Sequence, residues 1–472
     1  MKLKILSGII ILFILANSLV ASEKVDIVSA DKKKSDIDYK WEQINVDGFG
    51  SKNNYATRGM ETFQDSLIVG TGNLKNFPPE YPLRECFNLN MIDEMFVKPV
   101  SNGCEIWCYN DTGLRQIVGN NETATMESGF GNKNNSEVGF LISFKGYLYA
   151  GLLNPKQGGQ IWRTQDINEK WQMVVEKGFN NPNNWAAWSA EIFNDSLYVG
   201  TMNWREGCEI YRTEDGENWE IVVGGNSKTE NGFEKPITDM MTNYYAWAMK
   251  SYGSYLYVST VASIHDFWRS KDGINWERVA VPSRFPHFTQ HIRRMIVYNG
   301  ELYLGMTGPG GEAYSKITIG TKLFSFSIPR LFLLFPIPAQ IWKYNGSLDK
   351  WTRVVGGLGK KSNSAGFGHP KNARIWSMAV FNEQLYAGTG KGERTNFIIK
   401  KNGFLNWTGT VEQKGQGEVW IFNEDNWDQI NDPGFGDEYN IGLRSMHFYK
   451  NSLIVGTINI KTGCELWEYG CI

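Results

Sequence analysis

The sequence predicts an all-β fold, a seven-bladed β-propeller built from four-stranded antiparallel blades. Three observations predict it. A unit of four short strands recurs along the chain, turn residues separate the strands, and aromatic residues make up 14% of the 472 residues. One four-stranded sheet cannot bury both of its faces alone, so the repeated sheets are expected to pack on one another around a central axis.

The clearest copy of the unit lies at residues 185–222. Its four runs of apolar, β-branched and aromatic residues are separated by turn residues, including Asn194-Asp195-Ser196 and Asp215-Gly216. This pattern is typical of an antiparallel meander. The predicted strands are 188–193, 197–201, 209–212 and 219–222.

Seven copies of the second strand establish the number of units. They are LIVGT (67–71), LYAG (148–151), LYVGT (197–201), LYVST (256–260), LYLG (302–305), LYAGT (385–389) and LIVGT (453–457). The last unit has no fourth strand of its own, whereas residues 41–44 (WEQI) resemble a fourth strand that has no unit. The N-terminal strand is therefore predicted to complete and close the last blade, which removes exposed sheet edges.

The chain is predicted to have three parts. Residues 1–22 carry two early lysines, an apolar run and small residues, the pattern of a signal peptide cleaved after Ser18 or Ser22. An uncleaved signal anchor is the alternative. Residues 23–40 form a charged, flexible lead-in, and residues 41–472 form the single propeller domain. We therefore expect a protein that is secreted or held at the cell surface.

Charge and motif searches narrow the function. A formal net charge of -2 gives no global field that would recruit nucleic acid or an anionic membrane. His287 and His291 lack the helical setting that their spacing needs in a zinc site. No phosphate-binding glycine loop or nucleophile elbow is present. The sequence thus predicts no metal and no cofactor.

Six cysteines in an exported chain could form three disulfides. Cys104, Cys208 and Cys464 occupy the same position of the unit, which suggests buried strand-edge packing as readily as bridging. The candidate disulfides join Cys86 to Cys104 or Cys108, and Cys464 to Cys471.

Three units carry insertions between the second and third strands, at 72–103, 307–339 and 390–417. This loop opens on one face of a propeller, so the insertions are expected to mark the binding face. The apolar segment 323–338 is broken by prolines and too short to span a bilayer. It is interpreted either as a flap on the propeller or as a surface that contacts a membrane or a partner.

The turn between the third and fourth strands reads RTEDGENW at 212–219 and RSKDGINW at 269–276. Its Asp is expected to accept backbone N–H groups, and its Trp to pack into the blade. The turn resembles the Asp-box, or BNR, repeat of sialidases and related propellers. Because the FRIP-type motif of those enzymes is absent and they have six blades, the resemblance implies a non-catalytic relative.

Residues that recur in every unit are interpreted as scaffold, because a catalytic site is needed only once. The polar residue that opens each third strand is expected to accept backbone N–H groups from a neighbouring connection. These residues are Glu105, Gln160, Glu209, Asp266, Gln340, Glu418 and Glu465. A second recurring set is the Gly-Phe pair between units: Gly48-Phe49, Gly129-Phe130, Gly178-Phe179, Gly232-Phe233, Gly366-Phe367 and Gly434-Phe435.

One position of the repeated unit carries different residue types in different units, and we call it the variable column. It lies nine residues before the Leu of each second strand. It contains Arg58, Gly139, Trp188, Trp247, Arg293, Trp376 and Arg444. These residues are expected at the mouth of the central channel, where Arg would bind a carboxylate and Trp would stack on a sugar. The alternative is that the Trp side chains wedge between blades and the Arg side chains pair with the recurring acidic residues.

These patterns predict an exported, non-enzymatic binding propeller that recognises a glycan, an anionic small molecule or a protein on its insertion-bearing face. One alternative is a sialidase-like glycoside hydrolase that uses the arginine cluster, because sialidases hold their carboxylate substrate with an arginine triad. Its candidate nucleophiles are Tyr244 and Tyr245 and its candidate bases Glu61 and Glu191. The other alternative is a cell-surface adhesion module that uses 323–338. No nucleic-acid partner is expected.

Overall fold

The computed structural model divides the chain into two parts, Met1–Asp38 and Tyr39–Ile472. All described residues belong to the second part: 39–75, 80–81, 101–233, 243–261, 267–281, 291–307, 314–319, 338–357, 359–391, 394–401, 405–412, 415–423 and 425–471. The predicted signal peptide and nearly all of the predicted lead-in lie outside them. In this part of the chain, no helix is long and apolar enough to cross a membrane.

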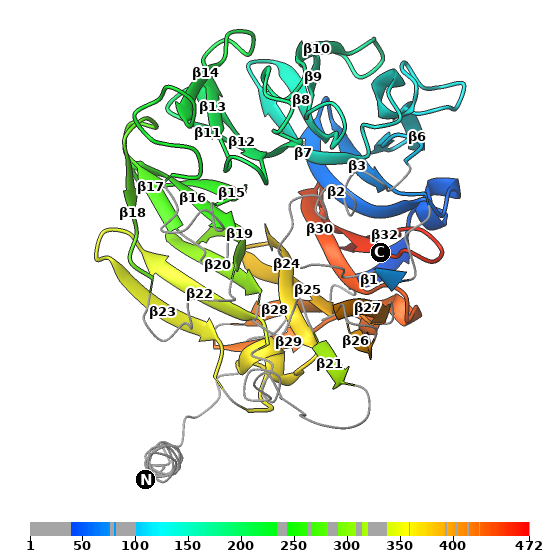
Figure 1. Ribbon diagram of the computed structural model, residues 1–472. Coiled ribbons are helices and arrows are strands. Elements are labelled where there is room, and N and C mark those ends of the chain that lie inside the picture. The colour runs from blue at the N-terminus through cyan, green and yellow to red at the C-terminus, as the bar shows by residue number, and fades with distance from the viewer. Residues whose placement is uncertain are drawn as a thin grey trace. The chain divides into compact units, whose positions relative to one another are not determined.

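The described residues form an all-β structure of antiparallel four-stranded groups (Figure 1). In the first group, β2 (Asn54–Phe63) pairs with β3 (Ser66–Asn73), β3 with β5 (Ile106–Asn110), and β5 with β6 (Gly113–Val118). Successive strands are neighbours, as in the predicted meander.

The same order recurs along the chain. The further groups are β7 (Glu137–Phe144), β8 (Tyr147–Leu153), β9 (Ile161–Thr164) and β10 (Gln172–Val175); β11 (Ala186–Phe193), β12 (Ser196–Met202), β13 (Ile210–Thr213) and β14 (Glu220–Val223); β15 (Tyr245–Tyr252), β16 (Tyr255–Val261), β17 (Phe267–Ser270) and β18 (Trp276–Arg278); β19 (His291–Tyr298), β20 (Glu301–Thr307), β22 (Gln340–Asn345) and β23 (Lys350–Val355); and β24 (Asn372–Phe381), β25 (Gln384–Lys391), β28 (Val419–Asn423) and β29 (Asn426–Gln429).

The last group joins the two ends of the described chain. Its strands β30 (Gly442–Tyr449), β31 (Ser452–Ile458) and β32 (Leu466–Cys471) pair in succession. The N-terminal strand β1 (Tyr39–Gln43) then pairs antiparallel with β32, from Tyr39↔Cys471 to Gln43↔Trp467. β1 therefore occupies the fourth-strand position of this group, where the sequence predicts it.

The first strands of the groups contact one another in order. β2 contacts β7, and the contacts continue through β11, β15, β19, β24 and β30, which contacts β2 again. Figure 1 shows these strands on the inner side of their groups. The described strands thus form a β-propeller in which each group packs on its neighbours.

The three predicted insertions contribute to one small separate sheet. Its strands are β4 (Glu80–Tyr81), β21 (Tyr314–Ile319), β26 (Arg394–Lys401) and β27 (Leu405–Glu412). β21 pairs parallel with β26, and β27 pairs antiparallel with both β26 and β4. Insertions from three different groups therefore meet. Residues 323–337 of the predicted apolar flap lie outside the described residues.

Local turn chemistry explains the hairpins. Between β11 and β12, Asn194 and Asp195 have φ values of 46° and 58°. Two successive left-handed residues match the twist of the flanking strands, and Asn and Asp adopt this conformation at low cost. The register Phe193↔Ser196 directly flanks the turn. The predicted turn is therefore confirmed.

The Gly-Phe pairs connect neighbouring groups. Gly129 and Phe130 both have positive φ values, 63° and 58°. The Gly129 N–H donates to the Cys104 carbonyl at 2.7 Å, whereas the Phe130 ring stacks on Trp162 at 4.9 Å. One dipeptide thus binds the third-strand regions of two successive groups. Equivalent ring stacks are Phe49–Trp107, Phe179–Tyr211, Phe233–Trp268, Phe367–Trp420 and Phe435–Trp467.

The polar residue at the start of each third strand was expected to accept backbone N–H groups, but its hydrogen-bond donors among the described residues are side chains. Gln160 accepts from the Asn135 side chain at 2.7 Å and from the Trp162 indole at 3.0 Å. The donors are side chains because an asparagine at or just before the start of the first strand reaches the third strand of the same group. The same asparagine and aromatic donors serve Glu105, Glu209, Glu418 and Glu465. Asp266 lies outside the described residues.

The prediction of disulfides is wrong for the described cysteines. Cys104, Cys108, Cys208 and Cys464 are buried, free thiols. Cys464 precedes β32 and Cys471 ends it, so the rise of about 3.3 Å per residue holds them far beyond disulfide reach. Cys86 lies outside the described residues. Burial raises the pKa of the Cys104, Cys208 and Cys464 thiols, so they pack as small apolar side chains.

Candidate functional site

The variable column of the sequence coincides with a β-bulge in every first strand. In β11, Ala187 pairs with Thr201 and Ser189 with Gly200, so Trp188 has no partner across the ladder. An extra residue of this kind re-aims its side chain. The register shifts at Arg58, Gly139, Trp188, Trp247, Arg293, Trp376 and Arg444.

These bulges surround a cavity of about 240 Å³ between the first strands. Column residues that line it are Arg58, Gly139, Trp188, Trp247 and Arg444. The other two column residues do not line it, and their neighbours in sequence, Arg294 and Ser377, do so in their place. Five of the seven residues that the sequence predicts at the channel mouth therefore line one cavity. The sequence prediction did not include Arg294.

Trp376 fits the alternative interpretation, because it acts as a wedge. A Cβ atom on Gly442 would lie 2.2 Å from the Trp376 ring, and one on Gly390 would lie 2.7 Å from it. The indole fills the space between β25 and β30, which only glycines leave open. Trp376 is 6% exposed.

Trp188 and Trp247 present their rings to arginines. The Arg58 guanidinium carbon lies 5.2 Å from the centre of the Trp188 ring, and that of Arg293 lies 4.4 Å from the centre of the Trp247 ring. The two indoles are 5.5 Å apart. Cation–π contacts of this kind hold guanidinium groups in place. Stacking of these rings on a sugar, as expected from the sequence, has no direct support in this arrangement.

Arg58 belongs to a largely buried polar triad. Its Nη2 lies 2.6 Å from Glu137 Oε2 and donates to the Tyr55 hydroxyl at 2.9 Å. Tyr55 in turn donates to Glu137. Burial raises the pKa of Tyr55, and so does the Glu137 charge. Glu137 begins β7 and is not one of the recurring acidic residues, so the expected pairing of arginines with that column is wrong at Arg58.

Arg294 crosses from β19 toward the two following groups. Its Nε donates to the Trp376 carbonyl at 2.7 Å and its Nη2 to the Arg444 carbonyl at 3.3 Å. Burial, followed by the charges of Arg58 and Arg293, lowers the pKa of Arg294 to about 10. The signal in the sequence is an arginine where most other units carry a small residue: Gly59, Ser189, Ala248, Ser377 and Ser445.

Arg444 is 6% exposed. Its guanidinium lies 6.0 Å from the Trp247 ring centre and 5.9 Å from that of Trp376. Among the described residues it has no hydrogen-bond or ion-pair partner. Burial lowers the pKa of Arg444 well below its ordinary value, the charges of Arg58, Arg294 and Arg293 lower it further, and the charge of Glu137 opposes them. A buried cation that has no ion-pair partner among the described residues therefore borders the cavity.

The catalytic candidates from the sequence are placed elsewhere. Glu61 accepts the Ser143 N–H at 3.2 Å, and Glu191 pairs with Lys250 at 2.9 Å. Both contacts bind one group to the next and are scaffold. Tyr245 packs beside Trp188 at 5.4 Å but does not line the cavity.

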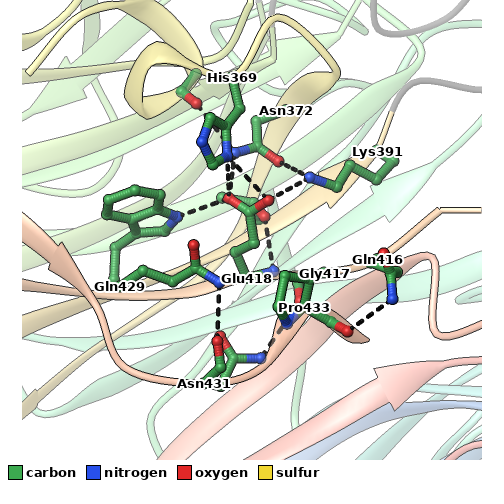
Figure 2. Close-up of polar contacts among 12 residues, drawn as sticks. His369, Asn372, Lys391, Gln416, Gly417, Glu418, Gln429, Asn431 and Pro433 are labelled. Carbon is green, nitrogen blue, oxygen red and sulfur yellow. Dashed lines mark hydrogen bonds and ion pairs between the residues drawn. The ribbon is translucent and has the colours of Figure 1, made fainter. Parts of the chain in front are cut away.

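A second polar cluster departs from the repeat in the group β24, β25, β28 and β29 (Figure 2). Lys391 donates to Asn372 Oδ1 at 2.7 Å and pairs with Glu418 at 2.5 Å. His369 Nδ1 lies 3.1 Å from the same carboxylate. Other groups place an asparagine where Lys391 stands: Asn73, Asn154, Asn203 and Asn459. Lys391 therefore serves as the donor of the recurring network.

The strand order and the cavity define an all-β propeller with a cluster of arginines among its first strands. Comparisons add no family: no family model matches the chain, and no curated protein matches it significantly.

Solved structures that resemble the chain are distant. The WD40 β-propeller domain of Doa1 is 9% identical with a TM-score of 0.45, covering 90% of this chain and 96% of that one. Raptor from Chaetomium thermophilum is 9% identical with a TM-score of 0.46, covering 92% and 29%. A chain of the mitotic checkpoint complex is 9% identical with a TM-score of 0.44, covering 96% and 99%. With TM-scores below 0.5, these likenesses support no conclusion about a ligand or partner.

Proposed function

We propose that the chain is a seven-bladed propeller, closed by its N-terminal strand, that binds a small anion in its central cavity. The seven second-strand motifs support the number of blades. The pairing of β1 with β32 and the return contact of β30 with β2 support closure of the ring.

The observation that carries the binding proposal is the set of three guanidinium groups around one cavity between the first strands. Arg58, Arg294 and Arg444 line it, and the described residues offer one carboxylate to them, Glu137. A buried charge without a counter-charge is costly, and arginine does not lose its proton in proteins. An anion in the cavity would offset that cost and accept hydrogen bonds from the guanidinium forks.

The cavity size favours a small ligand. Pockets for drug-sized molecules measure about 300–1,000 Å³, and this cavity measures about 240 Å³. A single small anion suits this volume better than an extended glycan or a protein segment.

We further propose that the chain is an exported relative of Asp-box propellers. In the turn after β13, Asp215 Oδ1 accepts the N–H groups of Glu217 and Asn218, both at 2.8 Å. Asp272 accepts the N–H groups of Ile274 and Asn275 in the same way after β17. Export rests on the signal-like residues 1–22. The adhesion alternative rests on 323–338, nearly all of which lies outside the described residues.

One observation favours a second candidate function, a sialidase-like hydrolase. Tyr55 and Glu137 form a hydroxyl–carboxylate pair beside Arg58, the combination that a tyrosine nucleophile and its base require. Against it, burial raises the pKa of Tyr55 and opposes formation of the nucleophilic phenolate. Purified protein assayed with fluorogenic sialosides from acidic to neutral pH tests this candidate, and absence of turnover at high protein concentration would exclude it.

Isothermal titration with a panel of small anions tests the binding proposal. The wild type is expected to bind, and Arg444→Met is expected to lose most of the affinity because it removes a cavity guanidinium while filling similar volume. Arg115→Met is the matched control, since Arg115 lies on the outer strand β6 and contacts Asn168. Equal loss in both variants, or no binding by the wild type, would contradict the proposal.

A further inference from the structure

We infer that the ligand of this cavity is a compact doubly charged anion, an inference that rests on the proposed function. The charge balance of the cavity points to it. Three arginines line the cavity, and Glu137 compensates one of them through its ion pair with Arg58 at 2.6 Å. Every other lining residue is a glycine, alanine, serine, leucine, methionine, phenylalanine or tryptophan. Two of the three positive charges therefore have no ion-pair partner in the described part of the chain.

The neighbouring Arg293 does not change this balance at the cavity. Its side chain donates to Thr307 and lies 4.4 Å from the Trp247 ring centre, and it does not line the cavity. It adds to the positive potential, because its charge contributes to the lowered pKa of both Arg294 and Arg444. Its presence strengthens the preference for higher negative charge.

The two uncompensated arginines differ in the donors that they retain. Arg294 uses Nε and Nη2 to bind the carbonyls of Trp376 and Arg444. The Arg444 guanidinium has no described hydrogen-bond partner, so all five of its donors remain available. Arg294 is thus held by the backbone of the neighbouring strands, while Arg444 offers an open fork. A fork of this kind binds two oxygens of one anionic group.

The position of the two arginines suits one compact ligand. Arg294 Nη2 reaches the backbone of Arg444 itself at 3.3 Å, so the side chains come from adjacent parts of the cavity wall. A monoanion would leave one buried charge uncompensated, and a large polyanion would exceed a cavity of about 240 Å³. Either a tetrahedral oxyanion or a short dicarboxylate supplies two charges in that volume.

A charge series tests this inference. Sulfate and malonate are titrated against acetate and nitrate at fixed ionic strength, with tryptophan fluorescence as a second readout because Trp188 and Trp247 line the cavity. Each dianion is expected to bind at least about tenfold more tightly than either monoanion. Arg444→Met is expected to erase that difference, whereas Arg115→Met keeps it.

The outcomes separate the two proposals. If acetate or nitrate binds as tightly as sulfate and malonate, the dianion inference fails while anion binding stands. If no anion binds, both fail. Preference for sulfate over malonate identifies a tetrahedral oxyanion, and the reverse identifies a dicarboxylate; both results support the doubly charged ligand. A dianion preference that persists in Arg444→Met would place the site elsewhere and overturn the inference.

Discussion

The hydroxyl of Tyr149 occupies the place where a Cβ atom of Gly216 would lie. A Cβ built on Gly216 falls 1.9 Å from the Tyr149 oxygen, and Gly216 has a φ of +80°. Tyr198 and Gly273 repeat the relationship at 1.9 Å. The tyrosine of one group's second strand thus packs against the glycine in the turn between the third and fourth strands of the next group. The same contact therefore joins two LYxG strands, at 148–151 and 197–200, to the DG turns of the groups that follow them.

Gly216→Ala is therefore expected to destabilise the protein more than a positive φ alone requires. The left-handed conformation costs about 1 kcal/mol for a non-glycine residue, and the clash with Tyr149 adds about 1–3 kcal/mol. Gly146→Ala is the matched control, because Gly146 also has a φ of +80° but has nothing within 4 Å of its Cβ position. Chemical denaturation measures both. Equal destabilisation would show that the Tyr149 contact carries no energy.

Asp215→Asn is expected to lower stability at neutral pH and to matter less in acid. Hydrogen bonds from the Asn218 side chain and from the backbone N–H groups of Asn218 and Glu217 hold the pKa of Asp215 below its usual range. A lowered carboxyl pKa contributes stability above the unfolded value of about 3.9, and this contribution is lost as the pH falls toward the folded value. Melting temperatures of both proteins from neutral pH down to about pH 2 measure the difference. A constant difference would contradict the prediction.

Arg444→Met and Arg58→Met are expected to have opposite effects on the ligand-free protein. Removing Arg444 relieves repulsion among buried guanidinium groups, so the free energy of unfolding at low salt is expected to rise by about 1 kcal/mol or more. Removing Arg58 leaves Glu137 buried without its ion pair and is expected to cost about 3–5 kcal/mol. Chemical denaturation of both variants and the wild type, in a buffer of large, weakly binding anions, measures these changes in the free energy of unfolding. Destabilisation by Arg444→Met of similar size would show that Arg444 is scaffold.

Lys391→Asn is expected to be tolerated better than Lys391→Met. Asparagine restores the residue that other groups use to donate to the first-strand asparagine, whereas methionine removes the hydrogen bonds that Lys391 donates to Asn372 Oδ1 and Glu418 Oε1. Breaking a buried pair on one side costs about 3–5 kcal/mol. Lys391→Asn is expected to cost less than half of that. Thermal unfolding of the two variants tests this prediction. Identical melting temperatures would show that a hydrogen-bond donor at position 391 does not stabilise the network.

The strands could be predicted from the sequence. The predicted runs 197–201 and 219–222 differ by one residue at each end from β12 (Ser196–Met202) and β14 (Glu220–Val223). Alternating apolar residues and turn signals are local properties, so they can be read without knowing the fold. The predicted disulfide between Cys464 and Cys471 was wrong because the extended strand β32 (Leu466–Cys471) separates the two residues.

Part of the candidate site could be predicted from the sequence. The variable column pointed to Arg58 and Arg444, but it did not reveal that each position is a β-bulge. It also missed Arg294, whose role depends on the carbonyls of Trp376 and Arg444 in two other groups. The pairing of Arg58 with Glu137 joins β2 to β7 and follows only from their packing.

The sequence by itself determined the repeated strands, the turns between them and the column of residues that varies among the units. These features follow from hydrophobic periodicity and turn chemistry within a few residues. The tertiary structure alone decided which of those side chains share a cavity. Arg58, Arg294 and Arg444 are far apart in the chain, and only the packing of the first strands and the bulges within them bring three positive charges to one place.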